Sequence, residues 1–160
     1  MRELLVGKIV GTHGIKGELK VLSDFKFSDK VFAKDKRIII NNKTYIINSV
    51  RKHKNFILIT LNDYNDINQV LDFIKKNIYI DEEDLVLNDE EILDEDLVKY
   101  HILTTDGKSG IIKEIFWASP TNKIMRVELD KEVLIPFNSP MIKSISKSKK
   151  EVIIELISGM

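Results

Sequence analysis

Three glycines at a spacing of three residues lie between two strand-like runs near the start of the chain. The glycines are Gly11, Gly14 and Gly17. The flanking runs, 4–10 and 18–22, are rich in Val, Ile and Leu, and His13 and Lys16 each directly precede a glycine. Glycine tolerates positive φ and close backbone approach, so we expect a tight turn that exposes peptide N–H groups beside an imidazole and an ammonium. Such a turn is suited to binding an anion or a partner carboxylate. A hairpin turn with no binding role is the simpler alternative.

The chain offers few groups for catalysis or for holding a metal. It has no cysteine, and its three histidines, His13, His53 and His101, are far apart in the sequence. His13 and Glu18 could form an acid–base pair, but such a pair more often only holds a turn. No nucleophile elbow, phosphate-binding loop, dinucleotide fingerprint or metal-ligand spacing is present. We therefore expect a protein that is not an enzyme and has no catalytic residues, no metal site and no cofactor.

A second candidate site is a dense basic turn in the front half of the chain. Arg51, Lys52 and Lys54 lie within four positions, and the aromatic Phe56 follows them. Cations in such a turn can contact RNA phosphates in a way that is sensitive to salt and largely blind to sequence. An exposed hairpin tip without a partner is the alternative.

A third candidate site lies in the rear half. Trp117, the only tryptophan, comes at the end of a strand-like run. A tryptophan at a loop edge can anchor a protein partner, or it can cap a core. Pro136 and Phe137 begin a stiff, partly apolar corner, which proline orders in advance. Phe137 can also belong to the core.

The formal net charge of the 160 residues is zero, but its distribution is uneven. Residues 1–80 carry a balance of +7, residues 81–96 carry −10, and residues 97–160 carry +3. A basic front half suggests contact with a polyanion, and solvated lysines are the alternative. No apolar run is long enough to span a bilayer and no signal peptide is evident, so we expect a cytoplasmic protein without a membrane partner.

The pattern of short β-branched and aromatic runs predicts a mainly β protein. In the front half the expected strands are 4–11, 18–22, 37–40, 45–51, 56–61 and 77–80. In the rear half they are 97–103, 111–117, 124–129, 133–137, 141–146 and 152–157. An apolar stripe before the sixth strand predicts a short helix, formed by Ile67, Val70, Leu71 and Ile74. We expect two small antiparallel β-barrel domains with one short helix late in the first, spanning 1–83 and 96–160 and joined by an acidic linker, 84–95.

The glycine turn resembles the N-terminal motif of the RimM family of ribosome maturation factors. The matching residues are His13, Gly14, Ile15, Lys16, Gly17, Glu18 and Leu19. The rear half is similar to the PRC-barrel domain that follows in that family. The matching segments are 96–98, 106–107, 110–112, 134–137 and 157–160, of which Leu-Ile-Pro-Phe at 134–137 is the most specific. Together the two matches cover essentially the whole chain in the order of the family.

Two positions depart from the family pattern. Paired aromatic residues commonly precede the entry to the second domain, but Ile92 and Leu93 stand there, followed by Asp94. Lys99 replaces a usual glycine. The binding roles of those aromatics therefore do not carry over to this chain.

The resemblance implies a non-catalytic assembly chaperone of the small ribosomal subunit. Its expected partners are the immature 30S subunit with its 16S rRNA and a ribosomal protein of the subunit head, uS nineteen, and we expect a monomer. The expected partner-binding residues are His13, Lys16, Glu18, Trp117, Pro136 and Phe137. Arg51, Lys52 and Lys54 are candidate RNA contacts. A general RNA-binding β-barrel protein and a PRC-barrel adaptor acting away from ribosomes remain as alternatives.

Overall fold

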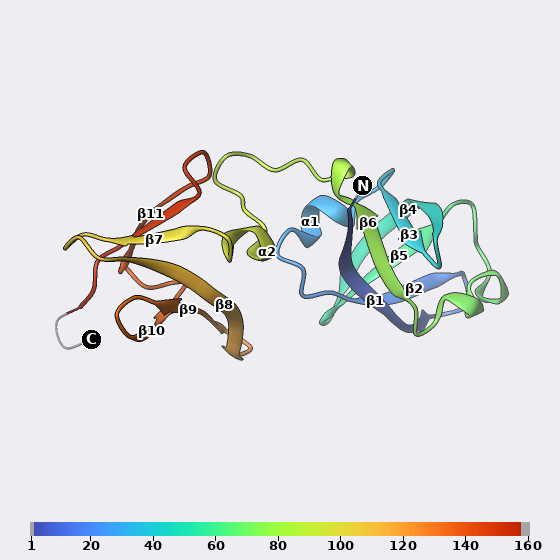
Figure 1. Cartoon of the computed structure of the whole chain (residues 1–160). Helices are drawn as coiled ribbons and strands as arrows, with labels where there is room; N and C mark the ends of the chain where they lie inside the picture. The colour runs from blue at the N-terminus through green and yellow to red at the C-terminus, as the bar shows by residue number, and fades with distance from the viewer. Residues whose placement is uncertain (1, 158–160) are drawn as a thin grey trace. The chain divides into compact units, whose positions relative to one another are not determined.

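The computed structural model describes residues 2–157, and the chain divides into two compact units, Met1–Val86 and Leu87–Met160 (Figure 1). Each unit is built around its own six-stranded sheet. The last three residues of the family-like segment 157–160 lie outside the described residues.

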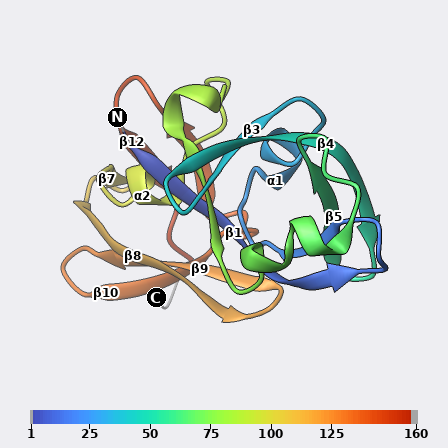
Figure 2. The ribbon, with the colours of Figure 1, turned by 90° about the vertical axis from the view of Figure 1, so that its right-hand side faces the viewer.

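The first unit is a closed barrel in which all paired strands run antiparallel. Its strands are β1 (Glu3–His13), β2 (Glu18–Leu22), β3 (Arg37–Ile40), β4 (Lys43–His53), β5 (Phe56–Leu61) and β6 (Asn77–Asp81). They follow one another around the barrel in the order β1-β2-β5-β4-β3-β6. Figure 2 labels β1, β3, β4 and β5 of this barrel. Alternate residues such as Leu4, Ile38 and Ile59 are almost completely buried, because period-two side chains face the interior. The six strands predicted here are confirmed.

The predicted late helix is present as two short 3₁₀ helices, η1 (Ile67–Gln69) and η2 (Leu71–Phe73). Val70 separates them with a φ of −122°. A 3₁₀ helix places residues i and i+3 on one face, so Val70 and Phe73 are both buried although the chain never completes an α-helical stripe. A four-residue α-helix, α1 (Ser28–Val31), was not predicted from the sequence.

The second unit is a six-stranded sheet in the order β10-β9-β8-β7-β12-β11. Its strands are β7 (His101–Thr104), β8 (Ser109–Ser119), β9 (Asn122–Glu128), β10 (Glu132–Pro136), β11 (Ile142–Ser146) and β12 (Glu151–Ile154). The mainly β prediction is confirmed, with two differences. The β7–β12 pair is parallel, and within the described residues β10 and β11 do not pair with each other. The first predicted strand begins late, because 94–97 form the helix α2 (Asp94–Leu97).

The acidic stretch after β6 is tied to the two units by basic side chains. Glu82 begins the 3₁₀ helix η3 (Glu82–Asp84) and accepts a hydrogen bond of 2.7 Å from Arg2. Further on, Lys147 donates hydrogen bonds of 3.0 Å to the carbonyl oxygens of Asn88 and Glu91. Ile92 and Leu93 are buried, as expected for apolar residues that lie against a domain surface. Ion pairs neutralise two carboxylates of this stretch, Glu82 with Arg2 and Asp84 with Arg37.

Gly110 in β8 has no room for a side chain, and this predicts a large effect of Gly110→Ala. A Cβ at this position would lie 2.0 Å from the carbonyl oxygen of Glu128 in β9. Because that atom is backbone, the β8–β9 ladder would have to move. We expect the second unit to lose about 3 kcal/mol of stability. Urea unfolding followed by the fluorescence of Trp117, the single tryptophan, measures this loss in the second unit.

Gly107→Ala is the matched control. Gly107 has a φ of +95°, but a Cβ there would meet nothing within 4 Å. Only backbone strain then opposes the substitution, which we expect to cost about 1 kcal/mol. Equal losses for the two variants would contradict a steric origin of the Gly110 effect.

Candidate functional site

The glycine turn between β1 and β2 is held in a defined conformation. Gly14 and Gly17 have φ values of +68° and +88°, which glycine adopts without strain. A Cβ on Gly17 would lie 3.3 Å from the backbone nitrogen of Asp66. The amide of Ile67 donates a 2.9 Å hydrogen bond to the carbonyl oxygen of Ile15. The turn therefore packs against the start of η1, and Ile15 remains 75% exposed at its tip.

Strand pairing brings the two predicted front sites together. β1, β2, β5 and β4 are neighbours in that order, and side chains of β4 reach the end of β1 and the start of β2. The guanidinium of Arg51 donates two hydrogen bonds of 2.8 Å, one to each carboxylate oxygen of Glu18. The rings of His13 and His53 lie 4.8 Å apart between centroids. We call Glu18, Arg51, His13 and His53 the front cluster.

The front cluster is electrostatically coupled. Hydrogen bonding to Arg51 lowers the pKa of the Glu18 carboxyl below its ordinary value, against the opposing effect of burial. The pKa of His53 is lowered mainly by desolvation, and neighbouring positive charges, first that of His13, add to this effect. Glu18, which could have formed an acid–base pair with His13, instead forms an ion pair with Arg51 beside two imidazole rings that are tilted by 55° to each other. The ion pair therefore orders this part of the surface.

The three candidate RNA contacts differ in whether a carboxylate lies beside them. Arg51 is neutralised by Glu18. The ammonium of Lys52 lies 3.4 Å from the carboxylate of Asp29, although both side chains are largely exposed. Within the described residues, Lys54 forms no ion pair, and its φ of +56° places it in the tight turn of the hairpin. Of the three, Lys54 is the cation most available to an anion.

In the second unit, the β8–β9 register places Trp117 opposite Lys123. The ammonium of Lys123 lies 5.6 Å from the ring centroid of Trp117 and 4.9 Å from that of Phe137. It also forms an ion pair with Asp94 at the start of α2. The Lys123 side chain is only 12% exposed, whereas Trp117 is 54% exposed. We call Asp94, Trp117, Lys123 and Phe137 the rear cluster.

Pro136 and Phe137 lie where β10 ends, next to the rear cluster. The amide of Phe137 donates a 3.0 Å hydrogen bond to the carbonyl oxygen of Lys123, and its ring packs against the core of the second unit. Sequence reasoning missed Lys123 and Asp94. Counting back from the Ser119–Asn122 pair would have placed Lys123 opposite Ala118, because a bulge between Trp117 and Ser119 shifts the register. No local signal indicates Asp94, which reaches the site through tertiary packing.

Across residues 2–157, no three side chains of His, Asp or Glu lie in a group that could hold a metal ion. In the same part of the chain, no helix is long and apolar enough to span a bilayer.

The fold and these two clusters define a mainly β protein of two six-stranded units with organised surface sites. A family profile described as the RimM N-terminal domain matches residues 4–85. The ribosome maturation factor RimM of Limosilactobacillus reuteri is 33% identical, over 97% of this chain and 96% of its own length. That of Oenococcus oeni is 30% identical, over 100% of this chain and 98% of its own. The chain therefore belongs to the RimM family of ribosome maturation factors.

Ribosome maturation factors of this family are non-catalytic, in agreement with the sequence prediction. Among solved structures, a 16S ribosomal RNA processing protein RimM from Pseudomonas aeruginosa aligns with 99% of this chain and 100% of its own, at a TM-score of 0.49 and 19% identity.

The Glu18–Arg51 pair predicts a pH-dependent effect of Glu18→Gln. Because the pKa of Glu18 is lower in the folded protein than in the unfolded chain, where it is near 4.5, ionised Glu18 stabilises the fold at pH values above 4.5. This stabilisation is lost as the pH falls through the pKa of the folded protein. We expect the variant to unfold at lower urea concentration than wild type at pH 7, and the difference to shrink below pH 4.5. Circular dichroism reports the unfolding of both units, and Trp117 fluorescence reports that of the second unit alone. The difference between the two urea transitions gives the stability of the first unit.

Asp29→Asn is the control for the Glu18 variant. It removes an ion pair whose side chains are 73% and 84% exposed, and such pairs contribute little to stability. A pH-independent difference for Glu18→Gln, or an equal effect of Asp29→Asn, would show that the ion pair is not the cause.

Lys123→Met is predicted to destabilise the second unit by about 2 kcal/mol. Methionine retains the apolar stem but removes the ammonium, so Asp94 loses its ion-pair partner and both rings lose a cation. Trp117 emission should shift at the same time.

Lys143→Met, which breaks an exposed pair with Glu155, is the control and should change stability little. Equal losses from both variants would refute the special role of Lys123.

Proposed function

We propose that this protein is a non-catalytic chaperone of small-subunit assembly. It binds the immature 30S subunit, contacts the head protein uS nineteen, and promotes head assembly and 16S rRNA processing. The observation that carries the proposal is the family membership over the whole chain. Relatives named ribosome maturation factor match both units in the same order, so the proposal does not depend on one motif.

The mechanism we propose is a shift of populations. The protein binds an intermediate arrangement of rRNA and protein more tightly than the finished head, so binding favours that intermediate without breaking a bond. Release follows when the head matures and the affinity falls. The protein acts in the cytoplasm as a monomer.

We propose separate roles for the two clusters. The glycine turn, with His13, Lys16 and Glu18, contacts the assembling particle, and the hairpin tip with Arg51, Lys52 and Lys54 lies close enough to contribute. Ordered residues lose little entropy on binding, and the ion pair of Glu18 supplies that order here.

The rear cluster is the proposed contact for uS nineteen. Trp117 is a half-exposed aromatic residue held from below by Lys123, while Pro136 and Phe137 stiffen the adjacent corner. Such rigid aromatic anchors dominate the binding energy of many interfaces. The acidic linker 84–95 joins the two contacts and disfavours RNA along its length.

The proposed function predicts where the protein sediments. In gradients of cell extract it should migrate with free small subunits and their precursors and be absent from translating ribosomes. Cells lacking it should accumulate precursor 16S rRNA. Presence only at the top of the gradient would favour an adaptor acting away from ribosomes. Equal binding to any naked RNA, without preference for the particle, would favour a general RNA-binding protein.

Trp117→Ala should weaken binding to purified uS nineteen about tenfold or more, as expected for a central aromatic anchor. Titration calorimetry with the full chain measures this change. Leu134→Ala is the matched control, because Leu134 is a similarly exposed apolar residue, 45% against 54%, on the opposite face of the same sheet. Equal weakening by both variants would place the contact elsewhere.

A further inference from the structure

We infer that the outer face of β1 and β6 binds a single-stranded RNA segment. This surface, the lysine–tyrosine face, comprises Lys8, Lys75, Lys76, Asn77 and Tyr79. None of its residues is among the contacts proposed above. The inference deepens the proposed function and rests on it for the biological source of the RNA.

Backbone hydrogen bonds fix the lysines of this face. The amide of Lys75 donates a 2.7 Å bond to the carbonyl oxygen of Ile9, and the amide of Ile9 donates a 2.9 Å bond to that of Lys76. The turn before β6 is thereby attached to β1. The strand register then places Lys8 opposite Asn77. Three lysines are thus gathered on two adjacent strands.

The three lysines are available to an anion. Lys8, Lys75 and Lys76 are all exposed, and within residues 2–157 none of them forms an ion pair. The predicted basic turn differs, because Glu18 neutralises Arg51 and Asp29 lies near Lys52, so that Lys54 is the one cation of that turn without an ion pair among the described residues. A cation without an ion pair gains more binding free energy from a phosphate than a cation that must first give up its contact with a carboxylate. Phosphate binding is therefore favoured at the lysine–tyrosine face over the hairpin tip.

Two neighbouring depressions give this face the shape for a nucleotide. One, of about 390 Å³, is lined by Glu3, Asn41, Asn42, Lys75, Lys76, Asn77 and Tyr79. The other, of about 470 Å³, is lined by Leu5, Val6, Gly7, Lys8, Leu22, Ser23, Asp24 and Asn77. Asn77 belongs to both. The first is suited to a phosphate and the second, which is more apolar, to a base.

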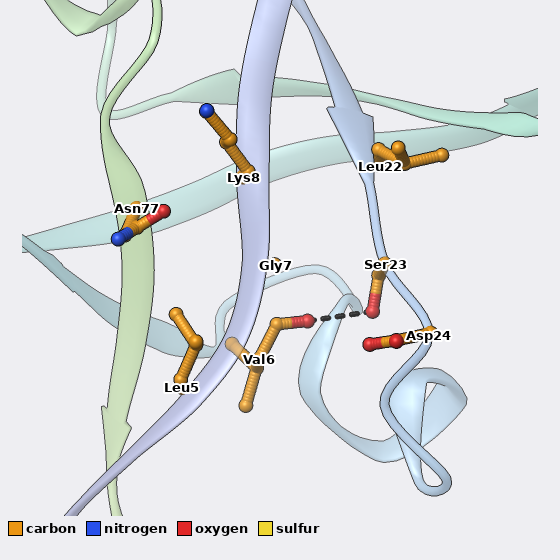
Figure 3. Close-up of a pocket in the computed structure, with 8 residues that line it drawn as sticks. All are labelled: Leu5, Val6, Gly7, Lys8, Leu22, Ser23, Asp24 and Asn77. Carbon is orange, nitrogen blue, oxygen red and sulfur yellow. Dashed lines mark hydrogen bonds between the residues drawn. The ribbon is translucent and has the colours of Figure 1, made fainter. Parts of the chain in front are cut away.

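The second depression carries polar groups at its margins. Figure 3 shows β1 running between Asn77 on one side and Leu22, Ser23 and Asp24 on the other. The hydroxyl of Ser23 donates a 2.6 Å bond to the carbonyl oxygen of Val6, which holds this margin in place. The Asp24 carboxylate and the Asn77 amide can hydrogen-bond to the edges of a base. Leu5 and Leu22, 56% and 50% exposed, offer it an apolar surface.

Two further features favour a single strand over a duplex or an acidic protein. Tyr79 is a partly buried aromatic residue on the same face, and unpaired bases stack on such rings. A duplex keeps its bases paired and presents mainly phosphate and sugar to a protein. Glu3 pairs in register with Asp81 at one end of the face, so a phosphate is expected at the lysine end only.

The test is the affinity of the full chain for a fluorescein-labelled single-stranded RNA of about ten nucleotides, measured by anisotropy against salt. The double variant Lys75→Gln with Lys76→Gln should lower the affinity roughly tenfold or more near 0.1 M salt and reduce the salt slope by about 1.4. Tyr79→Leu should lower it about fivefold or more, and Tyr79→Phe should leave it unchanged.

The matched control is Lys149→Gln with Lys150→Gln, two adjacent exposed lysines of the second unit, which changes the net charge equally and should lower the affinity by less than about threefold. An equal loss in both double variants, equal binding of duplex RNA, or tighter binding of an acidic peptide would each overturn the inference. If Tyr79→Leu fails to fold, the lysine variants decide alone. If the protein co-sediments with precursor particles but does not bind the short RNA, only this inference is overturned. If it binds the short RNA but does not co-sediment with precursor particles, only the proposed function is overturned.

Discussion

The two-sided pairing of β1 is the constraint on which both surfaces of the first unit depend. Its first half pairs with β6 and its second half with β2, with a bulge in each register. Backbone hydrogen bonds therefore fix Lys8 opposite Asn77 and His13 opposite Glu18. Because the barrel is closed, a slip of β1 along one neighbour would break its pairing with the other. The front cluster and the lysine–tyrosine face are thus set by one strand.

Ion pairing then decides what each basic side chain can do. Arg51 is committed to Glu18 and orders the end of the barrel, whereas Lys75 and Lys76 remain exposed without an ion-pair partner among the described residues. A basic sequence segment is therefore a poor guide to where a polyanion binds. The uneven charge of the chain produces one ordered turn and one open cationic face within a single small barrel.

The second unit achieves order in a similar way with different chemistry. The β8–β9 register sets Lys123 opposite Trp117, and the end of β10 brings Phe137 over the same ammonium. Asp94 then completes the cluster from α2. The ring of Trp117 contacts the ammonium of Lys123 and stays half exposed. A rigid aromatic surface results without the paired aromatics that are common in the family.

Residue patterns were sufficient to predict twelve strands, the glycine turn and the mainly β class, because alternation and turn propensity are local properties. They could not predict that Arg51 binds Glu18, 33 positions away, or that Asp94 reaches Lys123. The parallel β7–β12 pair and the break at Val70 were equally hidden. Where no tight turn connects two strands, their register depends on how the whole barrel packs. Tertiary contacts therefore decided that Arg51 and Lys123 gained carboxylate partners.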